Sequence, residues 1–405
     1  MVLKARRYTL VVLLVICSVW LGLMYYQPHN IKHGKEFLQP SIDFDDNKRT
    51  SYLNYTYRLR NIRTRSSSIY TEQVSKIRMS NTFVTDPSKC AEHTFLVYSC
   101  DYSRSCGGMG DRQRGIVSSF ILALITARVF IIDFEKPCEL DNFLKPTVYD
   151  WTICKRFIKN EKNALTIDMM NKSSMGIDMN NLRFNLWHWK VVFVKINSNL
   201  IYQLRKIKDI RTNYGWLLNM SIPSAYNMIL NLLFQPKDTL MSFLDNLIDQ
   251  NVKEKYLVCC HIRVGKNPSI PQDNAFGEFE KPNETIVFKY LKRYTDPDKY
   301  VIYLASDSLY VRSEFWKIFK NGIHIDVPII HVDRLGTHKH NEKEACDGLK
   351  YVLIEQYLLS TCDILILTAD SGFGKYAAYL RGSSDNLFLI QLNDSQVITT
   401  KLRYI

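Results

Sequence analysis

YLVCCHIRVGK, residues 256–266, is a short apolar run that ends at His261, Arg263 and Gly265. A run of β-forming residues that stops at polar residues and a glycine predicts a buried strand. The carboxyl end of such a strand opens into the crevice where α/β sheets bind ligands. A guanidinium stays charged at physiological pH and can hold a diphosphate, so Arg263 is the candidate diphosphate-binding residue. The alternative is a surface arginine in a salt bridge.

Two later segments place further polar residues at predicted strand ends. VIYLASDS, residues 301–308, ends in Asp307 and Ser308, and residues 362–382 predict a strand, a glycine-containing turn and a helix. Because the carboxyl ends of parallel strands meet at one edge of a sheet, these residues and those of the first stretch converge on one crevice. The turn can cradle a phosphate on its backbone N–H groups. It adds as candidates Asp370, Ser371, Gly372, Phe373, Gly374 and Lys375.

The first half of the chain predicts another β-α-β unit. Residues 95–100 and 127–134 are predicted strands, and apolar residues recur at helical spacing over 116–125. A glycine-rich turn lies before the helix, where orphan N–H groups and the helix dipole favour an anionic or polar ligand. The turn lacks the dinucleotide-binding spacing G-x-G-x-x-G, and a purely structural tight turn is the alternative. Its candidate binding residues are Gly108, Gly110, Asp111 and Arg112.

Strands and helices alternate through both halves, which predicts an α/β fold of two doubly wound domains. We expect one domain over 90–239 and the other over 240–405, joined by a helix at 240–255. The other predicted elements are strands at 190–196, 324–333 and 386–392 and helices at 226–234, 284–293 and 349–360.

The N-terminal region predicts a membrane anchor. Residues 8–26 are uncharged and apolar, and at about 1.5 Å per residue they reach roughly 28 Å, enough for a thin bilayer. Basic residues precede this run and few follow it at once, so 1–7 should be a cytoplasmic tail and the body should be lumenal. A cleaved signal peptide is the alternative, but no small-x-small site follows the run. The polar residues 27–89 predict a stem.

The cysteines and glycosylation sequons are compatible with a lumenal body. The chain has ten cysteines and no CxxC pair, which favours disulfides over a zinc site, although their pairing cannot be read. The net charge of +13 is spread along the chain without an RNA-binding motif, so we expect no nucleic acid partner. Five N-x-S/T sequons follow the anchor, at Asn54, Asn171, Asn219, Asn283 and Asn393.

Two smaller groups of residues allow two interpretations each. The aromatic cluster 187–189 could stack on a sugar ring, although such residues more often belong to a core. His338 and His340 have a spacing that could hold a metal, but no cysteine or carboxylate stands at a fixed distance from them. We therefore expect a solvated loop there and no metal site.

Four motifs together resemble those of the fucosyltransferase superfamily, which includes alpha-1,2-, core alpha-1,6- and protein O-fucosyltransferases. They are GGMGDR at 107–112, HIRVG at 261–265, ASD at 305–307 and TADSGFG at 368–374. The resemblance covers residues 95–392. It implies a GT-B fold, with two Rossmann-like domains facing a cleft, and transfer of fucose from GDP-fucose with inversion and without a metal or other cofactor. With the anchor, it implies a single-pass type II protein of the Golgi membrane.

The resemblance also implies roles for single residues. Arg263 would hold the donor diphosphate with His261 beside it, Asp307 would lie near the nucleoside, and Glu355 falls where the family places an acid that hydrogen-bonds guanine. Ser371 and its neighbours would meet the β-phosphate. The fucose would be approached from the other domain by Gly108, Gly110, Asp111 and Arg112. The acidic residue that usually closes HxRxGD is Lys266 here, which leaves a pseudoenzyme open.

The expected reaction is displacement of GDP at the anomeric carbon by a hydroxyl of a glycan or glycoprotein. Charge builds on the departing GDP, so positive charge at Arg263 should contribute most. Candidates for the general base are Asp111, Asp273 and Glu278. The HxRxG motif leans towards alpha-1,2 linkage. Two rivals remain, another GT-B transferase with a different nucleotide sugar and a lumenal glycan-binding pseudoenzyme.

Overall fold

The computed structural model describes the greater part of the chain after residue 66. The described residues are 67–80, 82–170, 186, 188–207, 213–265, 267, 282–323, 325, 327–333, 342–391 and 396–405. The predicted tail, anchor and most of the predicted stem lie outside them. Within these ranges no helix is both long and apolar enough to cross a membrane.

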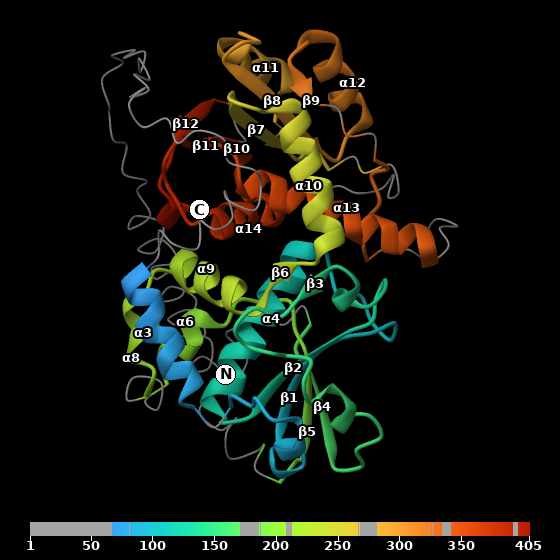
Figure 1. Ribbon diagram of the computed structural model, residues 1–405, viewed down its shortest axis with the longest axis vertical. Coiled ribbons are helices and arrows are strands. Elements are labelled where there is room, and N and C mark those ends of the chain that lie inside the picture. The colour runs from blue at the N-terminus through green and yellow to red at the C-terminus, as the bar shows by residue number, and fades with distance from the viewer. Residues whose placement is uncertain are drawn as a thin grey trace, which may run out of the picture. The chain divides into compact units, whose positions relative to one another are not determined.

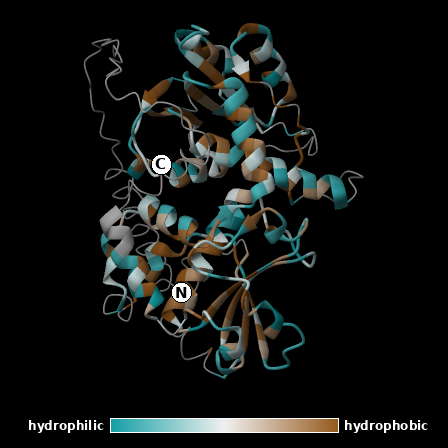
Figure 2. Ribbon diagram, viewed as in Figure 1, coloured by the Kyte–Doolittle hydropathy of each residue, from teal (hydrophilic) through white to brown (hydrophobic). Residues whose placement is uncertain are grey.

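The first sheet has four described strands, all parallel, in the order β2-β1-β5-β4. Strand β1 is buried throughout because it lies between two neighbours and under helix α4, and its bounds are those predicted. Figure 2 shows the same strands as a hydrophobic group. The bounds are β1 Phe95–Cys100, β2 Val129–Phe134, β4 Ala164–Asp168, β5 Val191–Lys195 and α4 Met109–Ile125.

The second sheet has six described strands in the order β12-β11-β10-β7-β8-β9, of which β12 alone is antiparallel to its neighbour. The stretch that opens with Tyr256 forms β7 at its centre, as predicted. The strands are β7 Tyr256–Ile262, β8 Tyr300–Ser306, β9 Gly322–Ile323, β10 Ile364–Thr368, β11 Leu387–Ile390 and β12 Val397–Thr399. The helices of this half are α11 Glu284–Leu291, α12 Leu309–Ile318, α13 Glu342–Ser360 and α14 Gly372–Arg381.

Helix α10 leads from the first half to the second, where Figure 1 shows it in yellow. Helix α14 packs against α9 and α4, so the two sheets share a helical layer. The remaining elements are helices α3 Ser67–Arg78, α6 Ile201–Leu204, α8 Gly215–Asn219, α9 Ile222–Leu233 and α10 Asp238–Asn251, strands β3 Leu144–Lys145 and β6 Gln235–Pro236, and 3-10 helices Pro87–Glu92, Leu140–Asn142, Lys155–Phe157, Lys292–Tyr294 and Leu402–Tyr404. The α/β class with parallel sheets is as predicted.

Three features differ from the expectations or were missed by them. The strand predicted at 324–333 was wrong, because β9 ends at Ile323 and residues 327–333 leave the sheet to bond with the first half. Helix α12 and strands β4 and β12 were not anticipated. Helix α3 lies in the range predicted as a stem, and its Val74 and Ile77 belong to the hydrophobic core.

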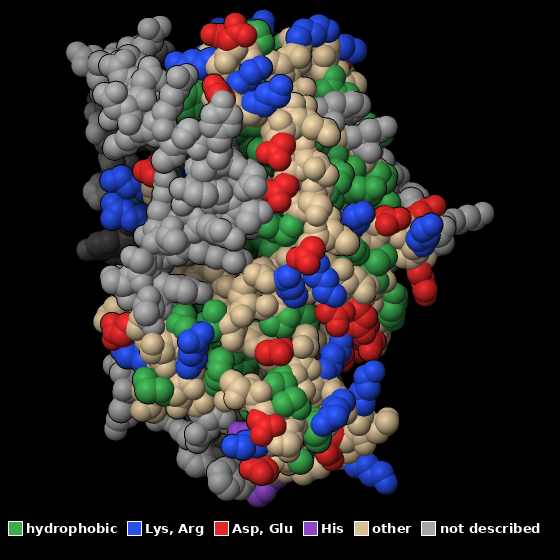
Figure 3. Space-filling model, in the orientation of Figure 1, with side chains coloured by type: hydrophobic (Ala, Val, Ile, Leu, Met, Phe, Trp, Pro, Cys, Tyr) green, Lys and Arg blue, Asp and Glu red, His purple; other side chains and the backbone are tan. Residues whose placement is uncertain are grey.

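Four disulfides join cysteines of the described residues, and one of them links the two halves of the chain. They are Cys90–Cys154, Cys100–Cys106, Cys138–Cys346 and Cys259–Cys362. Cys260 is a buried free thiol. On the face seen in Figure 3, basic and acidic side chains are interspersed.

Candidate functional site

A cavity of about 570 Å³ lies where the carboxyl ends of the second sheet face the glycine-rich turn of the first half. Its volume is within the range of small-molecule sites. Eleven of the predicted site residues line it: Gly108, Gly110, Asp111, His261, Arg263, Asp307, Glu355, Asp370, Ser371, Gly372 and Phe373. Five others, Arg112, Gly265, Ser308, Gly374 and Lys375, do not.

Arg263 reaches the cavity from the loop after β7, and Asp307 shapes that loop. The two side chains form an ion pair, and the Asp307 carboxylate also accepts the backbone N–H groups of Val264 and Gly265, both at 2.8 Å. Gly265 has a φ of +72°, a conformation that favours glycine, and closes the loop. Thr368 on β10 fixes the other side, since its Oγ1 accepts Arg263 N at 3.0 Å. The guanidinium is thus held at the edge of the sheet.

His261 is the buried residue beside Arg263. Burial lowers the pKa of His261 to about 4, with the Asp307 charge opposing and the Arg263 charge adding to this effect, so the imidazole is neutral at pH 7. Its ring contacts Phe373 with centroids 5.3 Å apart and packs over Gly374. Its Nδ1 is buried without a hydrogen-bond partner in the described part of the chain. A buried unpaired nitrogen at a cavity wall is a place for a ligand's polar atom.

Helix α14 begins at this wall. Ser371 is its N-cap but does not cap the helix with its side chain, so the N–H groups of the first turn lack that acceptor. Ser371, Gly372 and Phe373 line the cavity, and the positive end of the helix dipole lies there. Lys375 turns instead to the exposed Asp370, with Nζ 3.1 Å from Oδ1. Ser308 caps α12, since its Oγ accepts Val311 N.

Helix α4 begins on the opposite side of the cavity. Gly110 touches the first turn of α14, because a Cβ on Gly110 would lie 2.9 Å from the carbonyl carbon of Gly372. Asp111 Oδ2 accepts Gly108 N at 3.0 Å, and Asp111 Oδ1 is ion-paired with Arg114. Two helix N-termini therefore meet at one cavity, which concentrates positive potential.

Arg112 is buried completely and contacts protein instead of the cavity. Its guanidinium donates to the carbonyls of Gly107, Lys136 and Val332, stands over the Phe134 ring and lies 3.5 Å from Asp333. These contacts indicate that Arg112 stabilises the fold.

Glu355 lines the cavity from helix α13. Its Oε1 accepts Tyr303 Oη and Arg312 Nη2, both at 2.9 Å. Burial raises the pKa of Glu355, although the Arg312 charge and the two hydrogen bonds oppose that rise. Around it the walls are apolar, with Val327, Tyr351 and Val352.

Sequence reasoning missed several residues that line the cavity, among them Arg114, Arg312, Asn197, Asn267, Tyr351 and the segment 327–333. Arg114 had a signal. It stands four residues after Gly110 and therefore on the same face of α4, whereas Arg112 faces elsewhere. No sequence pattern indicated the position of the segment 327–333, because that position depends on contacts with residues that are distant in the sequence.

Nine residues singled out in the sequence lie outside the described residues: Asn54, Asn171, Trp187, Lys266, Asp273, Glu278, His338, His340 and Asn393. Among the residues that are described, no cluster of three His, Cys, Asp or Glu side chains could hold a metal ion.

No family model and no curated protein matches the chain. It is similar to several solved structures. A FUT1 variant from Arabidopsis thaliana in complex with GDP is 15% identical, with 84% of this chain and 80% of that chain covered and a TM-score of 0.48. The alpha-1,6-fucosyltransferase NodZ, known from Bradyrhizobium, was soaked with GDP-fucose and is 14% identical over 76% of this chain and 99% of that chain, with a TM-score of 0.47. POFUT1 in complex with GDP is 11% identical over 75% and 99%, with a TM-score of 0.41. These solved structures are fucosyltransferases, the superfamily that the sequence motifs resemble.

Proposed function

We propose that the cavity binds GDP-fucose and that the chain transfers fucose to a hydroxyl of a glycan or glycoprotein with inversion, on a GT-B-like frame of two α/β domains. One observation carries the proposal. The Arg263 guanidinium and the N-terminal turns of α4 and α14 line the same cavity, so three sources of positive potential face one place. That arrangement suits a diphosphate that gains charge as it departs.

The side of the cavity that α13 lines suits the nucleoside. Val327, Tyr351 and Val352 offer apolar walls for a flat base, and the Glu355 carboxyl group offers hydrogen-bond acceptors. Guanine presents two neighbouring donors, N1–H and the exocyclic amino group, whereas uracil presents one. We therefore infer a preference for GDP over UDP.

The reaction needs the leaving group stabilised and the acceptor hydroxyl deprotonated. Arg263 and the first-turn N–H groups of α14 supply fixed positive charge to the departing GDP, so the transfer is proposed to proceed without a metal. Asp111 is a proposed base, yet both of its carboxylate oxygens already have partners, Gly108 N and Arg114. The other two base candidates, Asp273 and Glu278, lie outside the described residues.

We further propose that the chain is a single-pass type II protein of the Golgi membrane with its body in the lumen. The four disulfides favour an oxidising compartment. The two sequons within the described residues, at Asn219 and Asn283, have exposed asparagines. Formation of an alpha-1,2 linkage is proposed on the HxRxG motif alone.

Donor turnover by the full chain tests the function. GDP-fucose, GDP-mannose and UDP-galactose are offered over a glycan array with and without EDTA. We expect transfer from GDP-fucose alone, unchanged by EDTA. Transfer from another donor would favour a different GT-B transferase. Binding of glycans without turnover would favour a glycan-binding pseudoenzyme. This second alternative is retained because a lysine stands at position 266, where the superfamily usually has an acidic residue.

A further inference from the structure

One wall of the cavity is the segment 327–333, and it is tied at both ends. At its start, Val327 O accepts Arg312 Nη1 at 3.2 Å, within the second half. At its end, Asp333 bonds to the first half of the chain. All seven residues of the segment line the cavity. The position of this wall therefore depends on Asp333 together with Val332, whose carbonyl accepts Arg112 Nη2 at 3.0 Å.

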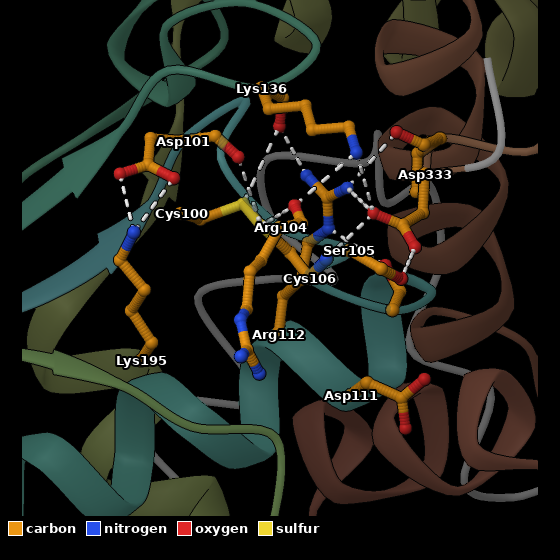
Figure 4. The surroundings of a disulfide bond; sticks show 12 residues. Cys100, Asp101, Arg104, Ser105, Cys106, Asp111, Arg112, Lys136, Lys195 and Asp333 are labelled. Carbon is orange, nitrogen blue, oxygen red and sulfur yellow. Dashed lines mark hydrogen bonds and ion pairs between the residues drawn. A yellow bond between two sulfur atoms is a disulfide. The ribbon is translucent and has the colours of Figure 1, made fainter. Parts of the chain in front are cut away.

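Asp333 gathers contacts from the loop that the Cys100–Cys106 disulfide closes, as Figure 4 shows. Its Oδ1 accepts Cys106 N at 2.7 Å, and its Oδ2 accepts the Ser105 hydroxyl. The same loop continues into the glycine-rich turn before α4. One carboxylate thus joins the wall to the turn, across more than two hundred residues of sequence.

The carboxylate is buried with two cations. The side chain of Asp333 is 2% exposed, that of Arg112 is not exposed, and Lys136 Nζ lies 3.2 Å from Asp333 Oδ1. Burial alone would raise the pKa of Asp333, but the hydrogen bonds from Ser105 and Cys106 and the two positive charges lower it, so the group stays ionised. Removing this charge would leave Arg112 and Lys136 without their shared counter-ion.

We propose that Asp333 is a positioning residue for the transfer, which fixes the wall 327–333 and the turn before α4 in the arrangement that receives the donor. This inference rests on the proposed function. The oxygens of Asp333 have protein partners, so it acts through the segments it joins. A wall released at one end must be ordered again whenever the donor binds, and that cost weakens donor binding.

The test is Asp333→Asn in the full chain, with GDP as the probe. The amide has the size of the carboxylate and keeps one acceptor oxygen, but it has no charge. We expect the Kd for GDP, measured by calorimetry, to rise about 10-fold, with kcat at saturating GDP-fucose within about 3-fold of wild type. In the ligand-free variant, amide hydrogen exchange should quicken in residues 327–333.

Gln113→Leu is the matched control. Gln113 and Gln356 are a buried amide pair that joins α4 to α13 without lining the cavity, with Nε2 of Gln113 2.6 Å from Oε1 of Gln356. This variant leaves the Gln356 amide poorly satisfied and should lower Tm by about 5 °C. Its Kd for GDP should stay within about 2-fold of wild type, because the wall is untouched.

The outcomes separate the two proposals. A wild-type chain that does not bind GDP overturns the proposed function. If the wild-type chain binds GDP and Asp333→Asn has the same Kd and the same exchange rates as wild type, the inference about Asp333 is overturned and the proposed function stands. If Asp333→Asn does not fold, Lys136→Met removes one partner from outside the cavity, and there a Kd rise of about 3-fold with faster exchange of the wall supports the inference. Unchanged exchange in Lys136→Met overturns it.

Discussion

The two glycine-rich helix starts, Cys106–Asp111 at α4 and Asp370–Gly374 at α14, face one cavity but use their side chains differently. In the first, Asp111 accepts Gly108 N, and Arg112, the residue that follows, donates to three backbone carbonyls. In the second, Ser371 does not cap its own helix, and the Nδ1 of His261, which has no hydrogen-bond partner among the described residues, lies against the first turn. The side chains at the start of α4 therefore bond to the protein, whereas those at the start of α14 leave polar groups open to a ligand, although both helix N-termini face the cavity.

The largest expected effect is on turnover, and it should distinguish Arg263 from Lys375, the other basic residue predicted at the donor site. Arg263→Ala should lower turnover about 10² to 10³-fold, which corresponds to about 3 to 4 kcal/mol of activation free energy. The variant lacks the fixed positive charge that stabilises the departing GDP. Lys375→Ala should stay within about 3-fold, since Lys375 pairs with the exposed Asp370 and does not line the cavity. Steady-state kinetics measures both. Near-normal turnover by Arg263→Ala would remove the basis of the mechanism.

The next effect contrasts Arg112 with Arg263 in stability. Arg112→Met should lower the free energy of unfolding by about 3 kcal/mol, because three buried carbonyls lose their donor and Asp333 loses a counter-ion. Arg263→Ala should change it by less than about 1 kcal/mol. Denaturant unfolding with the disulfides intact measures the difference. Equal stability of the two variants would mean that Arg112 does not hold the first turn.

His261 predicts a pH dependence of stability. Burial lowers the pKa of this histidine from its usual value of 6.5 to about 4. Between pH 4 and pH 6.5 the unfolded chain therefore binds a proton that the folded chain does not. Stability is therefore full above about pH 6.5 and falls as the pH decreases towards 4. From pH 7.5 to 5 the loss should be about 2 kcal/mol.

The test compares the free energy of unfolding at about pH 7.5 and about pH 5. His261→Asn should not lose stability between these pH values, whereas His188→Asn, which changes an exposed histidine, should lose as much as wild type. If His261→Asn and wild type lose the same stability, another group carries the pH dependence.

The smallest effect concerns the contact between the two turns. Gly110→Ala should raise the Kd for GDP about 10-fold, or about 1.4 kcal/mol, because its Cβ would push α4 away from Gly372 and part the two helix N-termini. Gly215→Ala is the control, since a Cβ there meets nothing within 4 Å. Calorimetry would show the contrast, and equal Kd values would mean that α4 does not contribute to the anion site.

Much of the second sheet could be predicted from the sequence, because its strands are buried runs of apolar residues. β7 and β10 needed only that pattern, and the polar residues at their ends followed from the geometry of a parallel sheet. Arg112 was placed at the donor because it is the last residue of the GGMGDR motif. Helical periodicity would have chosen Arg114, which shares a face of α4 with Gly110.

The segment 324–333 shows where sequence reasoning ended. Its apolar residues have the composition of a strand, and the bonds of Val332 and Asp333 to the first half help to make residues 327–333 a wall of the cavity. Such bonds between distant residues leave no local pattern. The pairing Cys138–Cys346 was hidden for the same reason.

The most direct test of the central claim is amide hydrogen exchange of the full chain with and without GDP. The account predicts slower exchange in three places: the loop 263–265, the first turn of α14 and the first turn of α4. Slower exchange in all three would show that Arg263 and both helix N-termini receive one ligand. Protection confined to other segments, or none at saturating GDP, would contradict the account.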